Sequence, residues 1–184
     1  LGISATTYAL PASTALAKRL RKEFPNLLII LGGAHANIAG IHAAKNITFV
    51  DIVCCHSEGE TVVLDILSKF SKHNFNRKTF LNDISTMKSI KGIIFRNKDE
   101  IVKNLPGDII KDLDYLPLPA RELFPIERYV PLPNQYKKLP LTNMIVIRGC
   151  PYVCTFCDQA ATTARRRSPQ KVIEEIREVV KKYG

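Results

Sequence analysis

The sequence contains no long hydrophobic run. Its longest continuous apolar stretch, residues 27–31, is far too short to span a bilayer. No basic segment followed by an apolar core marks a signal peptide at the amino terminus. Low-complexity tracts and internal repeats are also lacking, and 46% hydrophobic and 24% charged residues exclude a disordered acidic chain. We therefore expect a cytoplasmic protein without a membrane span.

The charge balance is basic but diffuse. The chain has 27 Lys and Arg against 17 Asp and Glu, and residues 1–60 hold five of the basic and four of the acidic side chains. A basic surface can bind nucleic acid. Here the basic residues are spread over several segments, and no aromatic-rich platform for single strands accompanies them. We interpret the excess as a solvated surface and do not expect a nucleic-acid partner.

Strand-like and helix-like patterns alternate in the first part of the chain. Apolar strands are predicted at residues 1–6, 27–31 and 49–55, and helices are predicted after Pro11, around residues 38–44 and from Glu58 onward. This alternation predicts an α/β fold, with a partial doubly wound parallel sheet and helices on both faces. Because Leu1 opens directly into a strand-like run, we expect a fragment whose leading strand is missing.

The pattern changes after residue 73. Residues 74–90 are polar and irregular, residues 93–102 predict a β-hairpin, and prolines recur from residue 105 to residue 141. An apolar strand is predicted at residues 144–147, and Ser168 with Pro169 predicts the start of a final helix. We therefore divide the chain into residues 1–73, a hairpin and proline-rich connector at residues 74–141, and the truncated start of a second domain at residues 142–184.

Three cysteines form the strongest chemical signal. Cys150, Cys154 and Cys157 have the spacing CxxxCxxC, between a predicted strand and a predicted helix. Thiolates are soft ligands that suit an iron–sulfur cluster or zinc. A structural zinc site needs a fourth ligand, and the nearest candidates, residues 54–56, are on another predicted strand, where both cysteines are expected to be buried small hydrophobes. An iron–sulfur cluster is favoured, with zinc or unliganded thiols as the alternatives.

The stretch RGCPYVCTFC resembles the cluster motif of radical S-adenosylmethionine (SAM) enzymes. The resemblance implies a 4Fe–4S cluster held by the three cysteines, SAM on the open iron, and Phe156 beside the adenine. It also implies that residues 142–184 are the first β/α unit of a partial TIM barrel, and that the partners are a small-molecule substrate and an electron donor such as flavodoxin or ferredoxin. Residues 165–167 resemble the basic turn before the first barrel helix, or are simply solvated.

The upstream segments resemble a cobalamin-binding, Rossmann-like domain found in one class of these enzymes. The resemblance rests on GISATT, LGGAHAN and VDIVCCHSEGE, with LPLPAREL in the connector. It implies that loops at the strand ends surround the nucleotide tail of cobalamin, with Ser4, Thr6, Gly32, Gly33 and His35 as contacts. A glycine pair after a strand is also commonly only a turn, and a lone histidine is more often structural than a ligand.

The resemblance implies an enzyme that reductively cleaves SAM to start radical chemistry. Methyl transfer to an unactivated carbon is the leading reaction, and an oxidative cyclisation similar to that of anaerobic magnesium-protoporphyrin ester cyclases is the alternative. A non-catalytic cobalamin carrier or sensor is the alternative of another class, although a carrier would not need the three cysteines. We expect residues 1–184 alone to be inactive.

Overall fold

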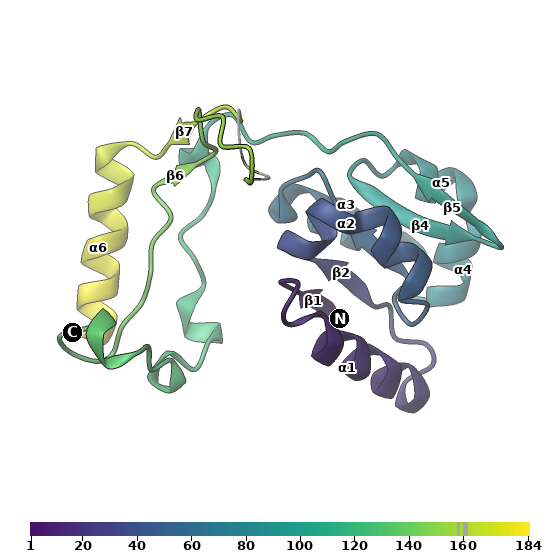
Figure 1. The fold of residues 1–184 in the computed structure, drawn as a ribbon, viewed down its shortest axis with the longest axis horizontal. Coiled ribbons are helices and arrows are strands. Elements are labelled where there is room, and N and C mark those ends of the chain that lie inside the picture. Colours follow the sequence, from purple (N-terminus) through teal and green to yellow (C-terminus); the bar gives the residue numbers. More distant parts are fainter. Residues whose placement is uncertain (158, 160–161) are drawn as a thin grey trace. The chain divides into compact units, whose positions relative to one another are not determined.

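The chain divides into two units, residues Leu1–Ile110 and Lys111–Gly184. The computed structural model describes residues 1–157, 159 and 162–184. The first unit holds a mixed sheet of five strands, and the second holds the connector, a two-stranded ladder and a helix. Figure 1 shows the helices and strands of both units.

The first sheet has the strand order β1-β2-β3-β4-β5. Strands β1 (Gly2–Ser4), β2 (Ile30–Gly32) and β3 (Ile52–Cys54) are parallel to one another. Strands β4 (Ile93–Asn97) and β5 (Glu100–Lys103) form an antiparallel hairpin that pairs with β3. The predicted α/β class and the parallel strands are confirmed, and the hairpin makes the sheet mixed.

Helices cover both faces of this sheet, because successive strand residues point to opposite sides. On one face, α2 (Ala34–Asn46) buries alanines against Leu31, Val53 and Ile94, and the start of α1 (Leu10–Glu23) packs beside them. On the other face lie α3 (Gly59–Lys72), α4 (Arg77–Asn82) and α5 (Ile84–Ser89), which bury Ile66, Phe80 and Met87 against Ile52 and Phe95. Two separate apolar cores result, as a doubly wound arrangement requires.

Residues 74–90 differ from the sequence-based expectation of irregular structure. They form α4 and α5, each with a side-chain cap at its start. Asn76 accepts hydrogen bonds from the backbone of Lys78 and Thr79, and Asp83 accepts one from the backbone of Thr86. Such caps compensate the unsatisfied N–H groups of very short helices. The helix after β2 is also longer than expected, and it bends at Ala39.

The hairpin extends the first sheet instead of starting a connector. Strand β4 pairs with β3 through Val53 opposite Ile94, and the compact unit continues to Ile110. The expected boundary at residue 73 thus differs from the division seen in the structure. The reason is that Ile93, Ile94 and Phe95 are all buried in the cores on the two faces of this sheet.

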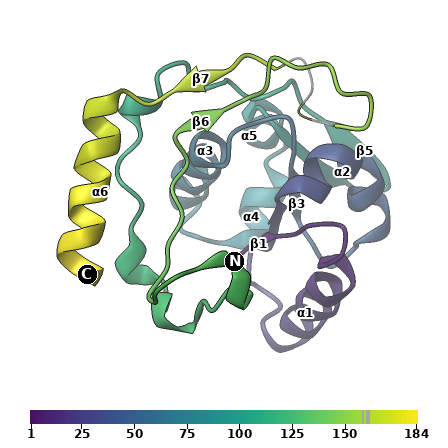
Figure 2. The same ribbon diagram turned by 60° about the vertical axis from the view of Figure 1, so that its left-hand side comes forward.

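The second unit contains little regular structure before its helix (Figure 2). Its proline-rich connector forms four short 3₁₀ helices, Leu113–Tyr115, Arg121–Leu123, Ile126–Arg128 and Pro133–Gln135. Strand β6 (Ile147–Arg148) pairs antiparallel with β7 (Arg165–Arg166), and α6 (Pro169–Tyr183) follows. The Ser168 side chain caps α6 by accepting from the backbone of Lys171, which confirms the predicted start of this helix.

Helix α6 turns a charged residue inward. Glu175 is its buried residue, whereas Ile176 and Val180 are exposed. None of the described helices combines the length and apolar content needed to cross a bilayer.

Candidate functional site

Two short strands fix the ends of the cysteine loop. Arg148 of β6 lies opposite Arg165 of β7. Gly149 follows β6 with a φ of 87°, and a Cβ at this position would overlap the carbonyl oxygen of Thr163. A residue without a Cβ is therefore required where the two segments approach. The loop leaves the ladder and returns to it at one place.

Thr162 joins the two ends of the loop through reciprocal hydrogen bonds. The backbone N–H of Cys150 donates to the Thr162 hydroxyl at 2.9 Å, and the backbone N–H of Thr162 donates to the Cys150 carbonyl oxygen at 2.9 Å. The same hydroxyl donates to the carbonyl oxygen of Gln159 at 2.8 Å. Sequence reasoning misses Thr162, because a threonine in a loop gives no signal of its distant partner.

The three cysteine thiols differ in exposure along this loop. Cys154 is exposed, whereas Cys150 and Cys157 are partly buried, and all three are free. The backbone N–H of Cys157 donates to the Cys154 carbonyl oxygen at 3.2 Å, and Phe156 is 91% exposed. In the part of the chain that the structure describes, no three His, Cys, Asp or Glu side chains lie close enough together to hold a metal ion. The three thiols thus share one loop, but they do not converge on a common metal position.

The chemistry of this donor set fits an iron–sulfur cluster. Three thiols on one loop with fixed ends are soft donors of the kind that hold such clusters. The ligand roles of Cys150, Cys154 and Cys157 and the SAM contact of Phe156 remain predictions.

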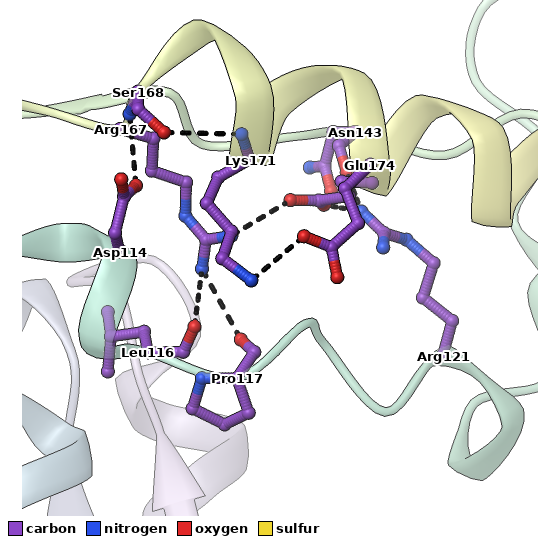
Figure 3. Close-up of polar contacts among 10 residues, drawn as sticks. Asp114, Leu116, Pro117, Arg121, Asn143, Arg167, Ser168, Lys171 and Glu174 are labelled. Carbon is purple, nitrogen blue, oxygen red and sulfur yellow. Dashed lines mark hydrogen bonds and ion pairs between the residues drawn. The ribbon is translucent and has the colours of Figure 1, made fainter.

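A buried carboxylate ties α6 to the connector. Glu175 is 2% exposed and accepts hydrogen bonds from Arg121 and Arg167. Arg121 also donates to the carbonyl oxygen of Asn143 at 2.9 Å, and Arg167 donates to that of Pro117 at 3.3 Å (Figure 3). Buried charges persist only when they are paired and hydrogen-bonded. The arginine of LPLPAREL therefore anchors the connector to α6.

The basic residues 165–167, which the sequence predicts as a turn, instead begin as strand β7, and the last of them has a structural role. Arg167 is 9% exposed and faces Glu175, so it is not part of a solvated turn. The next residue, Ser168, donates its backbone N–H to Asp114 at 2.9 Å. Hydrogen bonds from the Ser168 side chain and backbone lower the pKa of Asp114 below its usual value. This segment is thus held on both sides by acidic groups of the connector and α6.

A crevice lies at the carboxyl ends of the three parallel strands in the first unit. Its volume is about 550 Å³, and its lining includes Ser4 and Gly32 at the ends of β1 and β2. Asn37, Ser57 and Glu60 also line the crevice and add polar groups that sequence reasoning does not identify as contacts. Ligands commonly bind beyond the carboxyl ends of parallel strands. The crevice is therefore the candidate ligand site of this unit.

The two adjacent glycines at the crevice have different physical roles. A Cβ on Gly32 would meet only the Cβ of Cys54, at 4.0 Å, so Gly32 leaves open space. Gly33 has a φ of 90°, and a Cβ there would lie 2.7 Å from the backbone nitrogen of Ala5 and 2.8 Å from the Ser4 hydroxyl. Gly33 is thus required by the packing of the β1 end against the start of α2.

Two of the predicted cobalamin contacts lie outside the crevice lining. The Thr6 hydroxyl accepts a hydrogen bond from the backbone of Ala9 at 3.3 Å, next to the start of α1. His35 is 9% exposed, and its Nδ1 lies 3.2 Å from the Thr7 hydroxyl. Its Nε2 is buried and has no hydrogen-bond partner among the described residues. Only Ser4, Gly32 and Gly33 of the five are brought together.

Cys54 and Cys55 are buried, as the sequence predicts, and they belong to the apolar cores on opposite faces of the sheet. Burial raises the pKa of Cys54 to about 12 and raises that of Cys55. Both thiols therefore stay neutral near pH 7.

Residues 56–58, which follow β3, bind the start of the connector through hydrogen bonds. The backbone N–H of Gly107 donates to the His56 carbonyl oxygen at 3.0 Å, and that of Ile110 donates to the Glu58 carboxylate at 2.7 Å. Ser57, between them, lines the crevice. Glu58 is therefore an anchor for the connector as well as the residue that precedes α3.

No family model matches the chain. The chain is 29% identical over 187 residues to the anaerobic magnesium-protoporphyrin IX monomethyl ester cyclase of Cereibacter sphaeroides, covering 99% of the chain and 28% of the relative. It is 25% identical to an uncharacterized methyltransferase of Pyrococcus horikoshii, covering 100% of the chain and 37% of the relative. It is 26% identical to the cobalamin-dependent radical SAM methyltransferase TokK of Streptomyces tokunonensis, covering 96% of the chain and 24% of the relative. These similarities support kinship with radical SAM enzymes.

Proposed function

We propose that the complete protein is a radical SAM enzyme in which Cys150, Cys154 and Cys157 ligate a 4Fe–4S cluster. The observation that carries the proposal is the CxxxCxxC loop, whose ends are fixed by Gly149 and Thr162. Similarity to radical SAM relatives along nearly the whole chain supports it. When bound, such a cluster supplies the electron that cleaves SAM to methionine and a 5′-deoxyadenosyl radical.

The residues of the loop have separate tasks in this proposal. The three thiols would provide the ligands, and Phe156, whose ring is exposed, would contact the adenine of SAM. Thr162 holds the backbone of Cys150 at the base of the loop. Arg121 and Arg167, through Glu175, keep α6 and the connector in place behind the ladder.

The proposal places the nucleotide tail of cobalamin in the crevice of the first unit. Support comes from the open space beside Gly32 and from the hydroxyl and amide groups of Ser4, Asn37 and Ser57 around it. One relative is a cobalamin-dependent methyltransferase. Thr6 and His35 shape the loops without lining the crevice, since the backbone N–H of His35 donates to the Ala5 carbonyl oxygen at 3.0 Å.

Methyl transfer from cobalamin to an unactivated carbon of a small molecule is the first candidate reaction, with flavodoxin or ferredoxin as electron donor. The second candidate is an oxidative cyclisation, which the 29% identity to a magnesium-protoporphyrin cyclase favours. A non-catalytic cobalamin carrier explains the crevice but leaves the cysteine loop without a purpose. The three cysteines therefore separate the enzymatic proposal from this alternative.

The test uses the full-length protein, reconstituted with iron and sulfide without oxygen. We expect about four irons per chain and formation of 5′-deoxyadenosine from SAM under a strong reductant. Cys150→Ala, Cys154→Ala and Cys157→Ala should each abolish this cleavage. Cys55→Ala is the matched control, because it removes a thiol from the sheet core and should leave iron and cleavage unchanged. Cleavage retained in all three loop variants would refute the assignment.

A further inference from the structure

A cationic cavity lies at the edge of the first sheet opposite the crevice. Its volume is about 470 Å³. Strand β4 is antiparallel to β3, so the end of β4 meets the start of β3 at this edge. The charged residues of the lining are Asp51, Arg77, Lys78, Arg96 and Lys98. Four cations thus surround one carboxylate.

The single carboxylate is already fully used. Asp51 accepts hydrogen bonds on one oxygen from Arg21, at 2.7 Å, and from the backbone of Ile29, at 2.9 Å. Its other oxygen accepts two hydrogen bonds from Arg77, at 2.9 and 2.5 Å. The side chain of Asp51 is 4% exposed. The charge of Asp51 is therefore shared between Arg21 and Arg77, and it cannot also neutralise the other cations of the cavity.

Three cations remain in the lining without a carboxylate partner. Arg96 donates to the carbonyl oxygen of Ala44 at 2.6 Å, which orients the guanidinium but does not cancel its charge. Among the described residues, neither Lys78 nor Lys98 has a carboxylate within ion-pair distance. The neutral side chains of Thr48, Asn82 and Asn97 share the lining and can also hydrogen-bond a ligand. The arrangement is complementary to an anion.

The backbone at Lys98 gives a second, independent observation. Lys98 lies in the connection between β4 and β5 and has a φ of 54°. Glycine and asparagine are the favoured residues for a positive φ in a tight hairpin connection. A lysine at a disfavoured backbone position points to a role for its side chain. Lys98 is one of the residues that line the cavity.

We propose that this cavity binds a small ligand that carries an oxyanion of at least two negative charges, such as a phosphorylated metabolite. The volume lies in the range of small-molecule sites, about 300–1,000 Å³. Lys78, Arg96 and Lys98 supply the charge, and the neutral side chains fix the orientation. The site lies at the opposite edge of the sheet from the crevice and shares no residue with the crevice or with the cysteine loop.

The test is titration calorimetry of the full-length protein with pyrophosphate at constant ionic strength. We expect saturable binding with one site per chain, weakened about tenfold or more in the Lys78→Ala/Lys98→Gly double variant. Lys98→Gly also removes the disfavoured backbone conformation, so the variant should be no less stable to heat. Lys88→Ala is the matched control, because it removes a lysine from α5 that does not line the cavity, and it should bind normally.

Four outcomes would overturn the proposal. The first is the absence of saturable pyrophosphate binding. The second is an equal loss of affinity in the Lys88→Ala control, which would indicate nonspecific charge attraction. The third is binding of a short single-stranded RNA, but not of pyrophosphate or inorganic phosphate, that depends on the same two lysines. Unchanged affinity in a folded double variant would place the anion elsewhere.

Discussion

The two glycines at the crevice separate a ligand role from a packing role. Gly32 and Gly33 are adjacent and both line the crevice. The same change, to valine, should therefore act differently at the two positions. Gly32→Val should fill the crevice of a folded protein, whereas Gly33→Val should destabilise the first unit.

The magnitudes follow from the surroundings of each Cα. At Gly33 the backbone conformation, with a φ of 90°, costs about 1–3 kcal/mol for a residue with a Cβ. The approach to 2.7 Å of the Ala5 nitrogen adds overpacking of about 1–3 kcal/mol. The sum, about 2–6 kcal/mol, is comparable with the whole stability of many domains, about 5–15 kcal/mol. At Gly32 the nearest atom is 4.0 Å away, and replacing a strand glycine gains about 0.5–1 kcal/mol.

The assay measures thermal unfolding, bound cobalamin and iron on the same full-length samples. Cobalamin is measured by its visible absorption after desalting. Gly32→Val should keep the melting temperature and the iron content and should lose cobalamin. Gly33→Val should lower the melting temperature and lose cobalamin as a consequence.

Two results would refute this reasoning. Normal cobalamin content in a folded Gly32→Val protein would place the nucleotide tail outside the crevice. A Gly33→Val protein as stable as the wild type would show that the close approach of the β1 end to α2 is not required.

Three further predictions concern charged groups, two through substitutions and one through pH. Glu175→Gln should destabilise the second unit by about 3–5 kcal/mol, because it leaves two buried arginines without their carboxylate, and faster amide exchange in α6 would report this change. Asp51→Asn should lower the unfolding free energy of the first unit by about 3–5 kcal/mol in denaturant titrations. The control is Asp65→Asn, which removes a partly exposed ion pair and should change this free energy by about 0.5 kcal/mol or less. Hydrogen bonds from Thr86 and Ser85 lower the pKa of Asp83 to about 2, so the cap of α5 should be intact above about pH 4 and lost as the pH falls through about 2, seen as faster amide exchange in α5.

Local patterns in the sequence are sufficient for most of the strands. The apolar run at residues 27–31 overlaps β2, the run at residues 49–55 contains β3, and the residues around Asn97 form the predicted hairpin connection. These elements depend on burial and on turn residues, which are both visible within a few positions. The attachment of the hairpin to β3 is not visible in this way, because nothing local specifies which strand edge it will pair with.

The elements missed by sequence reasoning are those that depend on single contacts. Helices α4 and α5 are too short to show a helical period, and each buries one large side chain, Phe80 or Met87. Helix α2 buries mainly alanine and glycine, so its inward face has little contrast with the rest. A prediction based on such a weak amphipathic pattern therefore gives too short a helix.

The residues of the candidate sites also divide into those that local sequence reveals and those that depend on distant contacts. The sequence identifies the thiols and the strand-end glycines, because their chemistry depends on residue type. It does not identify Thr162, or the contact of Arg121 with Glu175 across 54 positions, because their partners are distant in the sequence. Side chains that support a site are therefore harder to predict than those that perform its chemistry.

The support at the base of the cysteine loop has a direct bearing on the proposed cluster. Gathering three thiolates orders the segment between them, and the entropy cost depends on how freely its ends move. Gly149 and the hydrogen bonds between Cys150 and Thr162 hold those ends together. Part of the ordering is thus complete in the folded chain before any ligand bond forms. Residues that are not themselves cluster ligands can in this way strengthen cluster binding.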